Sequence, residues 1–214
     1  MNKRARALTL IELLVVVSII SVLAGIALPS LLEARVRSQV ARVKADHAAI
    51  AGALEAYTVD WGQEPRMTWM FAPYDNTTSY GYADNCLSTP VAYIGSVSRA
   101  YQDPFATEDL NVTPSQFVAT GYLFHGASSY ARIAEAQFPF GGSPVERPAF
   151  ARAFRRSAGS WALSSLGPDL STPDARSRPY WTIYDPTNGT ISAGNIFRTQ
   201  REPEPQRLDF EGAY

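Results

Sequence analysis

The stretch RARALTLIELLVVVSIISVLAGIALP, residues 4–29, decides the fold. Its apolar run has roughly the 20 residues that a helix needs to cross the hydrocarbon core of a bilayer. Glu12 lies near the start of this run, although a carboxylate at the bilayer centre costs on the order of 2.5 to 3.5 kcal/mol. Either the charge has a partner, or Glu12 lies at the interface near the helix start, where an acid favours the helix dipole.

The flanks of the apolar run are compatible with either a membrane-spanning helix or a secretory signal peptide. Residues 1–7 form a short basic leader, and basic residues also follow the run, so the positive-inside rule does not fix the orientation. A secretory signal peptide would instead be cut after a small residue such as Ala24 or Ala27.

Beyond Pro29 the helical pattern continues with a different face. Apolar residues recur at steps of three and four, which predicts one buried stripe along an amphipathic helix over residues 30–61. Gly62 and Pro65 are expected to end the helix. His47 lies on the stripe and is interpreted as a core or boundary residue. The stripe consists of Val36, Val40, Val43, His47, Ile50, Leu54, Tyr57 and Trp61.

Composition excludes several classes of function. The chain has 214 residues and a formal net charge of −1, which argues against a general nucleic-acid binder. Cys86 is the single cysteine, so no intramolecular disulfide can form, and the two histidines lack zinc-site spacing. No phosphate-binding loop or nucleophile elbow is present. The carboxylates of the head form no recognisable catalytic arrangement, so we expect no enzyme; they include Asp103, Glu108, Asp109 and Glu135.

The remainder reads as a globular head. We expect a variable insertion over residues 62–158, a C-terminal β-sheet region over 159–200 and an exposed tail over 201–214. The segments GYLFHG (121–126), AFARAF (149–154) and SWALSSLG (160–167) are interpreted as strands, and YWTIYDPTNGTIS (180–192) as a hairpin.

The leader, the small residue Ala7 and the apolar run with Glu12 and Pro29 in register resemble the type IV prepilin-like family, which includes the pseudopilins of type II secretion. The resemblance implies an α+β, pilin-like fold, with a long N-terminal helix packed on a small antiparallel sheet. It also implies that a prepilin peptidase removes residues 1–7 and methylates the new amine of Leu8. Glycine is usual at the position of Ala7 and phenylalanine at that of Leu8. Residues 8–29 are then the transmembrane and polymerisation helix.

The resemblance supplies a partner for the buried charge. The cationic amine of Leu8 in a neighbouring subunit would pair with Glu12, and at about 4 Å and an effective dielectric near 20 such a pair gains roughly 4 kcal/mol. Pro29 would let the helix bend. The implied partners are further copies, other pseudopilins, the peptidase and the inner-membrane assembly platform. The implied location is the bacterial inner membrane, N-terminus cytoplasmic and head periplasmic, and then a periplasmic pseudopilus or a surface filament.

The C-terminal region carries a second resemblance. SWALSSLGPD (160–169) and YDPTNGTISAGNIFR (184–198) are similar to the major, G-type pseudopilins. In that group the two loops hold calcium, which implies ligands at Leu166 and Asp169, with Asn195 where an aspartate is common and Asp174 as a compensating carboxylate. The alternative is that Asp169 and Asn195 cap turns.

Three classes of function remain: a structural subunit of a pseudopilus or pilus-like filament, a minor or tip pseudopilin acting as a membrane-tethered periplasmic binding module, and a membrane-anchored enzyme. Polymerisation that depends on leader removal would distinguish the first class from the others.

Overall fold

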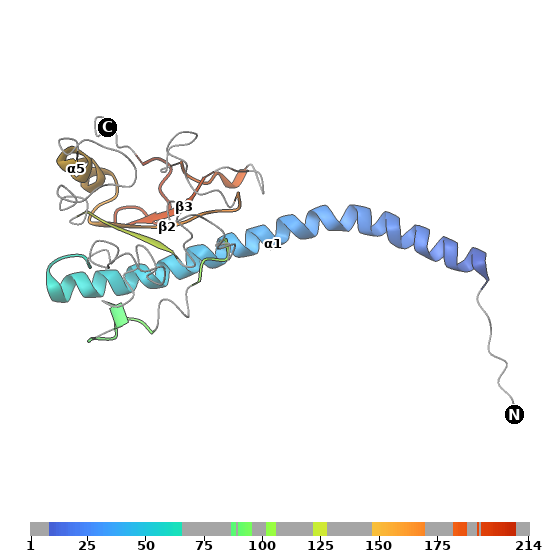
Figure 1. Cartoon of the computed structure of the whole chain (residues 1–214), viewed down its shortest axis with the longest axis horizontal. Coiled ribbons are helices and arrows are strands. Elements are labelled where there is room, and N and C mark those ends of the chain that lie inside the picture. Colours follow the sequence, from blue (N-terminus) through green and yellow to red (C-terminus); the bar gives the residue numbers. More distant parts are fainter. Residues whose placement is uncertain are drawn as a thin grey trace, which may run out of the picture.

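The computed structural model has a long helix projecting from a small head (Figure 1). It describes residues 9–65, 87–88, 90–95, 102–105, 122–127, 147–169, 182–187, 192 and 194–208. The expected α+β class is confirmed. In chain order the elements are α1 (Leu10–Trp61), β1 (Leu123–Gly126), α5 (Arg147–Ser157), β2 (Trp161–Ser165) and β3 (Ile196–Thr199).

Helix α1 is capped at both ends by local sequence. Thr9 has extended backbone angles, and its hydroxyl accepts a hydrogen bond from the Glu12 amide, as an N-cap should. At the other end Gly62 has a φ of 67°, and its N–H donates to the Thr58 carbonyl at 2.9 Å. Glycine adopts this left-handed conformation without steric cost, so the predicted end of the helix is confirmed.

Pro29 lies inside α1, and the helix continues through it. Its ring nitrogen has no hydrogen to donate to the carbonyl of Gly25 one turn earlier, which weakens the helix locally. The helix changes direction within its apolar half (Figure 1), as a missing backbone hydrogen bond favours.

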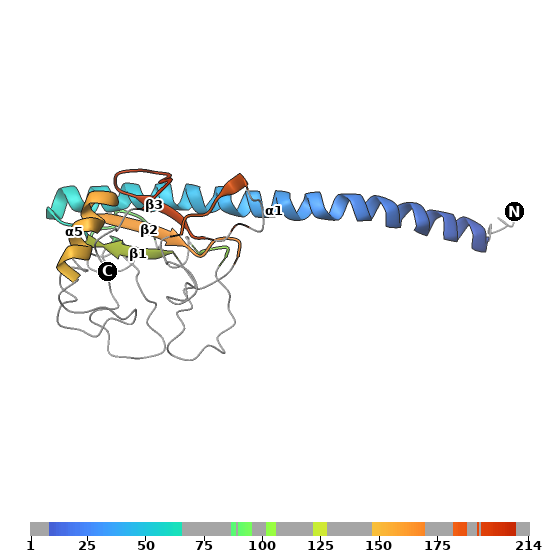
Figure 2. The ribbon, with the colours of Figure 1, turned by 90° about the horizontal axis from the view of Figure 1, so that it is seen from above.

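A three-stranded antiparallel sheet in the order β1-β2-β3 packs against the second half of α1. Leu163 of β2 lies opposite Phe124 of β1 and Arg198 of β3, so β2 is the central strand. Figure 2 shows the strands side by side along the helix. The predicted stripe packs here, with its central residues buried, whereas Trp61 at its end remains 52% exposed.

The sheet is covered on both faces. Phe124, Trp161 and Leu163 belong to the core shared with α1. Ala162 faces the other way and packs with Ala151 and Phe154 of α5 in a second cluster. Strand β2 is therefore buried along its whole length. The sequence did not predict burial of both faces, because Ser164 and Ser165 are polar.

The strand predicted at residues 149–154 is wrong, because these residues lie within α5. Ala151, Phe154 and Ala158 are buried at spacings of three and four, the period of a helix, while Arg155 and Arg156 remain exposed. The alternation of alanine and phenylalanine in AFARAF imitates the period of a strand over too short a window.

The predicted hairpin is also not found in the part of residues 180–192 that the structure describes. Ile183 forms an isolated parallel bridge with Asn195 instead. The reason is local: the Asp185 amide donates to the Ser192 hydroxyl at 2.8 Å, and the Asp185 carboxylate accepts from the Thr187 amide at 2.8 Å. Side-chain hydrogen bonds therefore link the described residues of this segment, and residues 188–191 at the predicted turn lie outside the described residues.

The described start of the tail lies against the head. Glu204 forms an ion pair with Lys44 of α1 at 2.9 Å, and the Arg201 amide donates to the Ala158 carbonyl at 3.3 Å. Pro205 is buried, although most of residues 201–208 are exposed.

Candidate functional site

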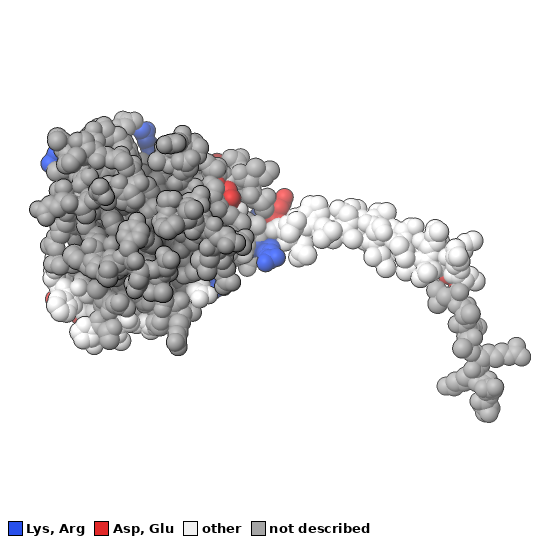
Figure 3. Space-filling view, viewed as in Figure 1, with Lys and Arg blue, Asp and Glu red and all other residues white. Residues whose placement is uncertain are grey.

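The projecting half of α1, defined as residues 10–32, carries a continuous exposed apolar surface. Its large apolar side chains are all 50–79% exposed, and Glu12 is its one charged residue. Figure 3 shows the described part of this rod as an almost entirely white surface that extends from the head. By length and composition α1 could cross a membrane, and none of its apolar window is buried inside the molecule. This segment therefore needs lipid or other protein to cover it.

The serines of the projecting half need no outside partner. The hydroxyls of Ser18 and Ser21 donate to the carbonyls four residues earlier at 2.8 Å, and Ser30 donates to Ala27 at 2.9 Å. Such back-bonding satisfies a hydroxyl within its own helix. Glu12 is thus the one polar side chain of residues 10–32 that does not bond a carbonyl of its own helix.

Glu12 is held by a reciprocal capping box with Thr9. The Thr9 amide and hydroxyl each donate to Oε2 of Glu12 at 2.8 Å, and the Glu12 amide donates to the Thr9 hydroxyl at 3.2 Å. This arrangement satisfies orphan groups at a helix start. The hydrogen bonds from the Thr9 amide and from the Thr9 hydroxyl therefore both end on Oε2. Among the described residues, none donates a hydrogen bond to Oε1 of Glu12.

Sequence reasoning placed Glu12 correctly near the helix start but missed Thr9. The signal was present, because Thr9 and Glu12 have the spacing of a capping box before an apolar run. The predicted cleavage and methylation residues Ala7 and Leu8 lie outside the described residues, directly before Thr9.

The two loops of the expected calcium site do lie side by side. Gly167, after β2, has a φ of 78°, and a Cβ there would overlap the carbonyl oxygen of Gly194. Leu166 is buried and Asp169 half-buried in the first loop, and Asn195 is buried in the second. The Asn195 backbone is engaged in the bridge to residues 182–184, where it accepts from the Tyr184 amide at 2.9 Å.

The described donors fit calcium in kind but not in number. Calcium takes six to eight oxygens, and the described loops offer one carboxylate, one amide side chain and carbonyl groups. Asp174 lies outside the described residues. Within the part of the chain that the structure describes, no group of three or more His, Cys, Asp or Glu could hold a metal ion.

Asp103 organises the first of these loops, a role that sequence reasoning missed. Its carboxylate accepts from the Phe105 amide at 2.9 Å and from the Leu166 amide at 3.2 Å. Burial raises the pKa of Asp103, while these hydrogen bonds act against the rise. The signal was the Asp-Pro-Phe sequence, since aspartate commonly bonds the amide two residues on.

The head also buries two histidines away from the projecting half. Burial, with a smaller contribution from Arg198, lowers the pKa of His47 to about 3. Burial lowers the pKa of His125 to about 3 as well, and its Nε2 lies 3.0 Å from the Ser164 hydroxyl. The His47 ring packs edge-on against Tyr122 at 4.7 Å, so its position in the core is confirmed.

Comparison with known proteins agrees with this geometry. The family model described as the prokaryotic N-terminal methylation motif matches residues 2–28. The Type II secretion system core protein G of Klebsiella pneumoniae is 27% identical over 119 residues, which cover 53% of this chain and 79% of that protein. No solved structure matches the chain significantly. The matched motif, the pseudopilin relative, the long apolar helix and the small antiparallel sheet together support a type IV pilin-like, pseudopilin assignment for the chain.

Proposed function

We propose that the chain is a filament subunit that is stored in the inner membrane as a prepilin. A prepilin peptidase cuts it between Ala7 and Leu8 and methylates the Leu8 amine. The mature chain then polymerises through the projecting half of α1 into a type II secretion pseudopilus or a related filament. The matched motif and the pseudopilin relative support the structural role, and the processing and the assembly are the proposal.

One observation carries the proposal: the projecting half exposes apolar side chains on every side of the helix. A helix that is hydrophobic all round is found buried, either in a bilayer or in the core of a large assembly. The same segment serves both environments, so a chain can leave the membrane only if copies of itself replace the lipid.

The capping box explains how Glu12 tolerates both environments. In a single chain Thr9 satisfies Oε2 of Glu12. We propose that in the filament Oε1 accepts from the methylated amine of a neighbouring Leu8. A buried charge left without its partner is strongly destabilising, so the pair would fix the register between neighbouring helices.

The proposed orientation puts residues 1–7 in the cytoplasm, where the peptidase cuts, and the head in the periplasm. The proposed partners are further copies, other pseudopilins, the peptidase and the inner-membrane assembly platform. We also propose that Leu166, Asp169, Asn195 and Asp174 bind calcium weakly, with further oxygens from residues 170–181 needed to complete the coordination shell.

Co-expression with and without a prepilin peptidase tests this function. We expect intact-mass spectrometry of membrane-extracted protein to show a mature chain that begins at methylated Leu8, and electron microscopy to show filaments in the presence of the peptidase alone. A mature chain that begins after Ala24 or Ala27 would contradict the proposal, because it would identify a secretory signal peptide. Correctly processed protein that never forms filaments would favour the membrane-tethered binding module.

A further inference from the structure

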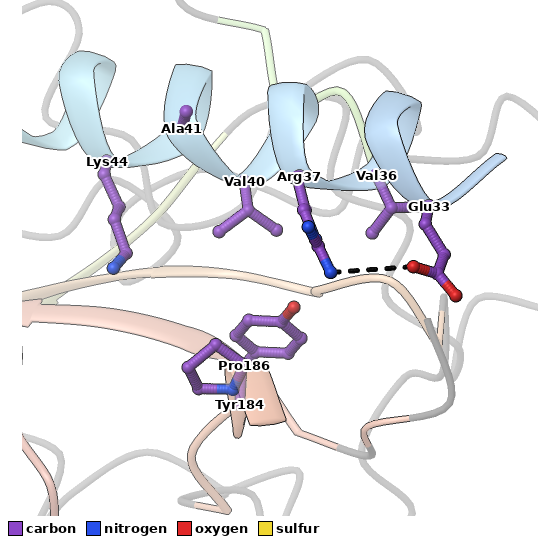
Figure 4. A pocket seen from close by; sticks show the side chains of 8 residues that line it. All are labelled: Glu33, Val36, Arg37, Val40, Ala41, Lys44, Tyr184 and Pro186. Carbon is purple, nitrogen blue, oxygen red and sulfur yellow. Dashed lines mark ion pairs between the residues drawn. The ribbon is translucent and has the colours of Figure 1, made fainter. Parts of the chain in front are cut away.

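A groove lies at the base of the head, where α1 leaves it. This basal groove has a volume of about 320 Å³ and is lined by Val36, Arg37, Val40, Lys44, Tyr184 and Pro186, with Glu33 at its edge. Figure 4 shows the side chains of Val36, Arg37, Val40 and Lys44 extending from α1 toward Tyr184 and Pro186. The groove therefore combines an apolar floor with charged walls.

The basal groove lies at the depth of phospholipid head groups if α1 spans a membrane. The twenty residues between Glu12 and Glu33 carry no charge and extend about 30 Å, the thickness of the hydrocarbon core. Glu33 then marks the edge of the core, and Arg37 lies about 6 Å beyond it, within the head-group layer. Side chains on a helix lean toward its N-terminus, so Arg37 and Lys44 lean toward the membrane.

The basal groove carries charged residues of both signs, namely Glu33, Arg37 and Lys44. Arg37 Nη2 lies 3.5 Å from Glu33 Oε2, with the two side chains 79% and 56% exposed. An ion pair this exposed contributes little by itself, so its members are available to other charges. Lys44 pairs with Glu204, and the Asp185 carboxylate accepts hydrogen bonds from Thr187 in its own turn. The groove thus offers an adjacent cation and anion to the membrane.

We propose that the basal groove binds one phospholipid whose head group carries a phosphate next to a primary ammonium. Arg37 binds the phosphate, with the two parallel N–H groups of its guanidinium suited to that shape. Glu33 accepts hydrogen bonds from the ammonium, and the first carbons of an acyl chain lie against Val36 and Val40. This inference rests on the proposed function, because the site exists only while α1 is in the membrane. The lipid would leave when the subunit enters the filament.

Native mass spectrometry of the full-length protein in a neutral detergent tests this site with three lipids: phosphatidylethanolamine, phosphatidylcholine and phosphatidylglycerol. We expect one phosphatidylethanolamine to be retained in preference to both others, because the trimethylated ammonium of phosphatidylcholine has no hydrogen to donate. Glu33→Gln should abolish the preference over phosphatidylcholine. Soluble phosphoethanolamine at the same concentration should not displace the lipid, since it lacks the acyl chain.

Arg35 provides the matched control for Arg37. Both are exposed arginines of α1 at nearly the same depth, but residues two apart do not share a helix face, and Arg35 does not line the groove. A typical hydrogen bond contributes about five-fold in binding. Arg37→Gln should therefore lower phosphatidylethanolamine retention about five-fold, and Arg35→Gln less than two-fold.

Equal losses in Arg35→Gln and Arg37→Gln would overturn the site, as would preferential retention of phosphatidylglycerol or displacement by soluble phosphoethanolamine. Carbonate extraction of membranes separates this failure from that of the proposed function. Protein released by carbonate would contradict membrane insertion and both proposals. Protein that resists extraction but retains the three lipids equally would overturn the basal groove alone.

Discussion

The two halves of α1 share one continuous backbone but have opposite surroundings. Between Val36 and Leu54 the helix buries one stripe against the sheet and exposes the rest, whereas residues 10–32 expose apolar side chains all round. Polar groups differ in the same way: His47 is buried within its own chain, and Glu12 is exposed and bonded to Thr9. The comparison teaches that the first half is not folded against this chain at all, so its environment has to be supplied from outside.

We expect the largest difference between the two halves when leucine is replaced by alanine once in each half and the stability of the head is measured. Leu54 is fully buried and Leu23 is 61% exposed. Leu54→Ala should destabilise the head by about 2–5 kcal/mol, because it leaves a cavity in the core. Leu23→Ala should change the stability of the head by less than about 0.5 kcal/mol. Urea unfolding in detergent, followed by near-UV circular dichroism, measures both, and equal losses would mean that the two halves are not independent.

The second expected effect is a dependence of the stability of the head on pH. An unfolded histidine has a pKa near 6.5, and burial lowers the pKa of His47 and of His125 to about 3. The unfolded state therefore binds more protons below pH 6.5, so stability present above that pH is lost as the pH falls toward 3. Between pH 7 and pH 5 each histidine should cost about 2 kcal/mol.

His47→Phe checks this effect, since it should remove about half of the loss between pH 7 and pH 5 in urea unfolding. His47 faces Tyr122 and Arg198, and Tyr122 in turn donates a hydrogen bond to Asp46. Asp103 acts in the opposite sense, because burial raises its pKa, so variant and wild type are compared at the same pH values. An unchanged pH dependence in His47→Phe would show that this ring is not the group that titrates.

A smaller effect belongs to the projecting half. Thr9→Val removes the hydroxyl that bonds the Glu12 amide and Oε2, and loss of an N-cap costs about 1 kcal/mol. Amides 10–13 should exchange hydrogen about five-fold faster in detergent micelles. Thr58→Val is the control, because its hydroxyl bonds the Leu54 carbonyl in the other half. Unchanged exchange in Thr9→Val would mean that the capping box does not hold the helix start.

The smallest expected effect is that of calcium. A ligand present at its dissociation constant stabilises a protein by about 0.4 kcal/mol. We expect titration calorimetry to give a heat of calcium binding that Asp169→Asn removes. Asp185→Asn should leave it, because that carboxylate bonds Thr187 within its own turn. Absence of both heat and stabilisation would leave turn capping as the role of Asp169 and Asn195.

The sequence was informative wherever a long periodic pattern set the structure. The stripe of α1, the Gly62 cap and strand β2 were predictable because burial, glycine geometry and β-rich composition all act locally. Helix α5 was not, because residues 149–154 span too few turns to separate a period of two from one of 3.6. The buried side of α5 packs with Ala162 on the face of the sheet that points away from α1. This long-range contact cannot be predicted from the local sequence pattern.

Some residues of the candidate site were predictable from the sequence, and others were not. Glu12 and Pro29 were predictable as anomalies, since a charge and a proline stand out in an apolar helix. Thr9 carried a recognisable capping signal that was overlooked beside the charge of Glu12. The contacts of Asp103 with Leu166 join residues 63 positions apart, and such a pairing becomes visible only when the fold is known.

Filament yield in a matched pair of variants tests the central claim most directly. Glu12→Gln and Glu202→Gln each remove one exposed carboxylate, but only Glu12 lies within the projecting half. At equal expression and equal processing, quantitative electron microscopy should show filament yield reduced at least ten-fold in Glu12→Gln and near wild type in Glu202→Gln, because an unpaired amine in an apolar filament core costs several kcal/mol. Wild-type yield from Glu12→Gln would contradict the pairing of Glu12 with a neighbouring N-terminus.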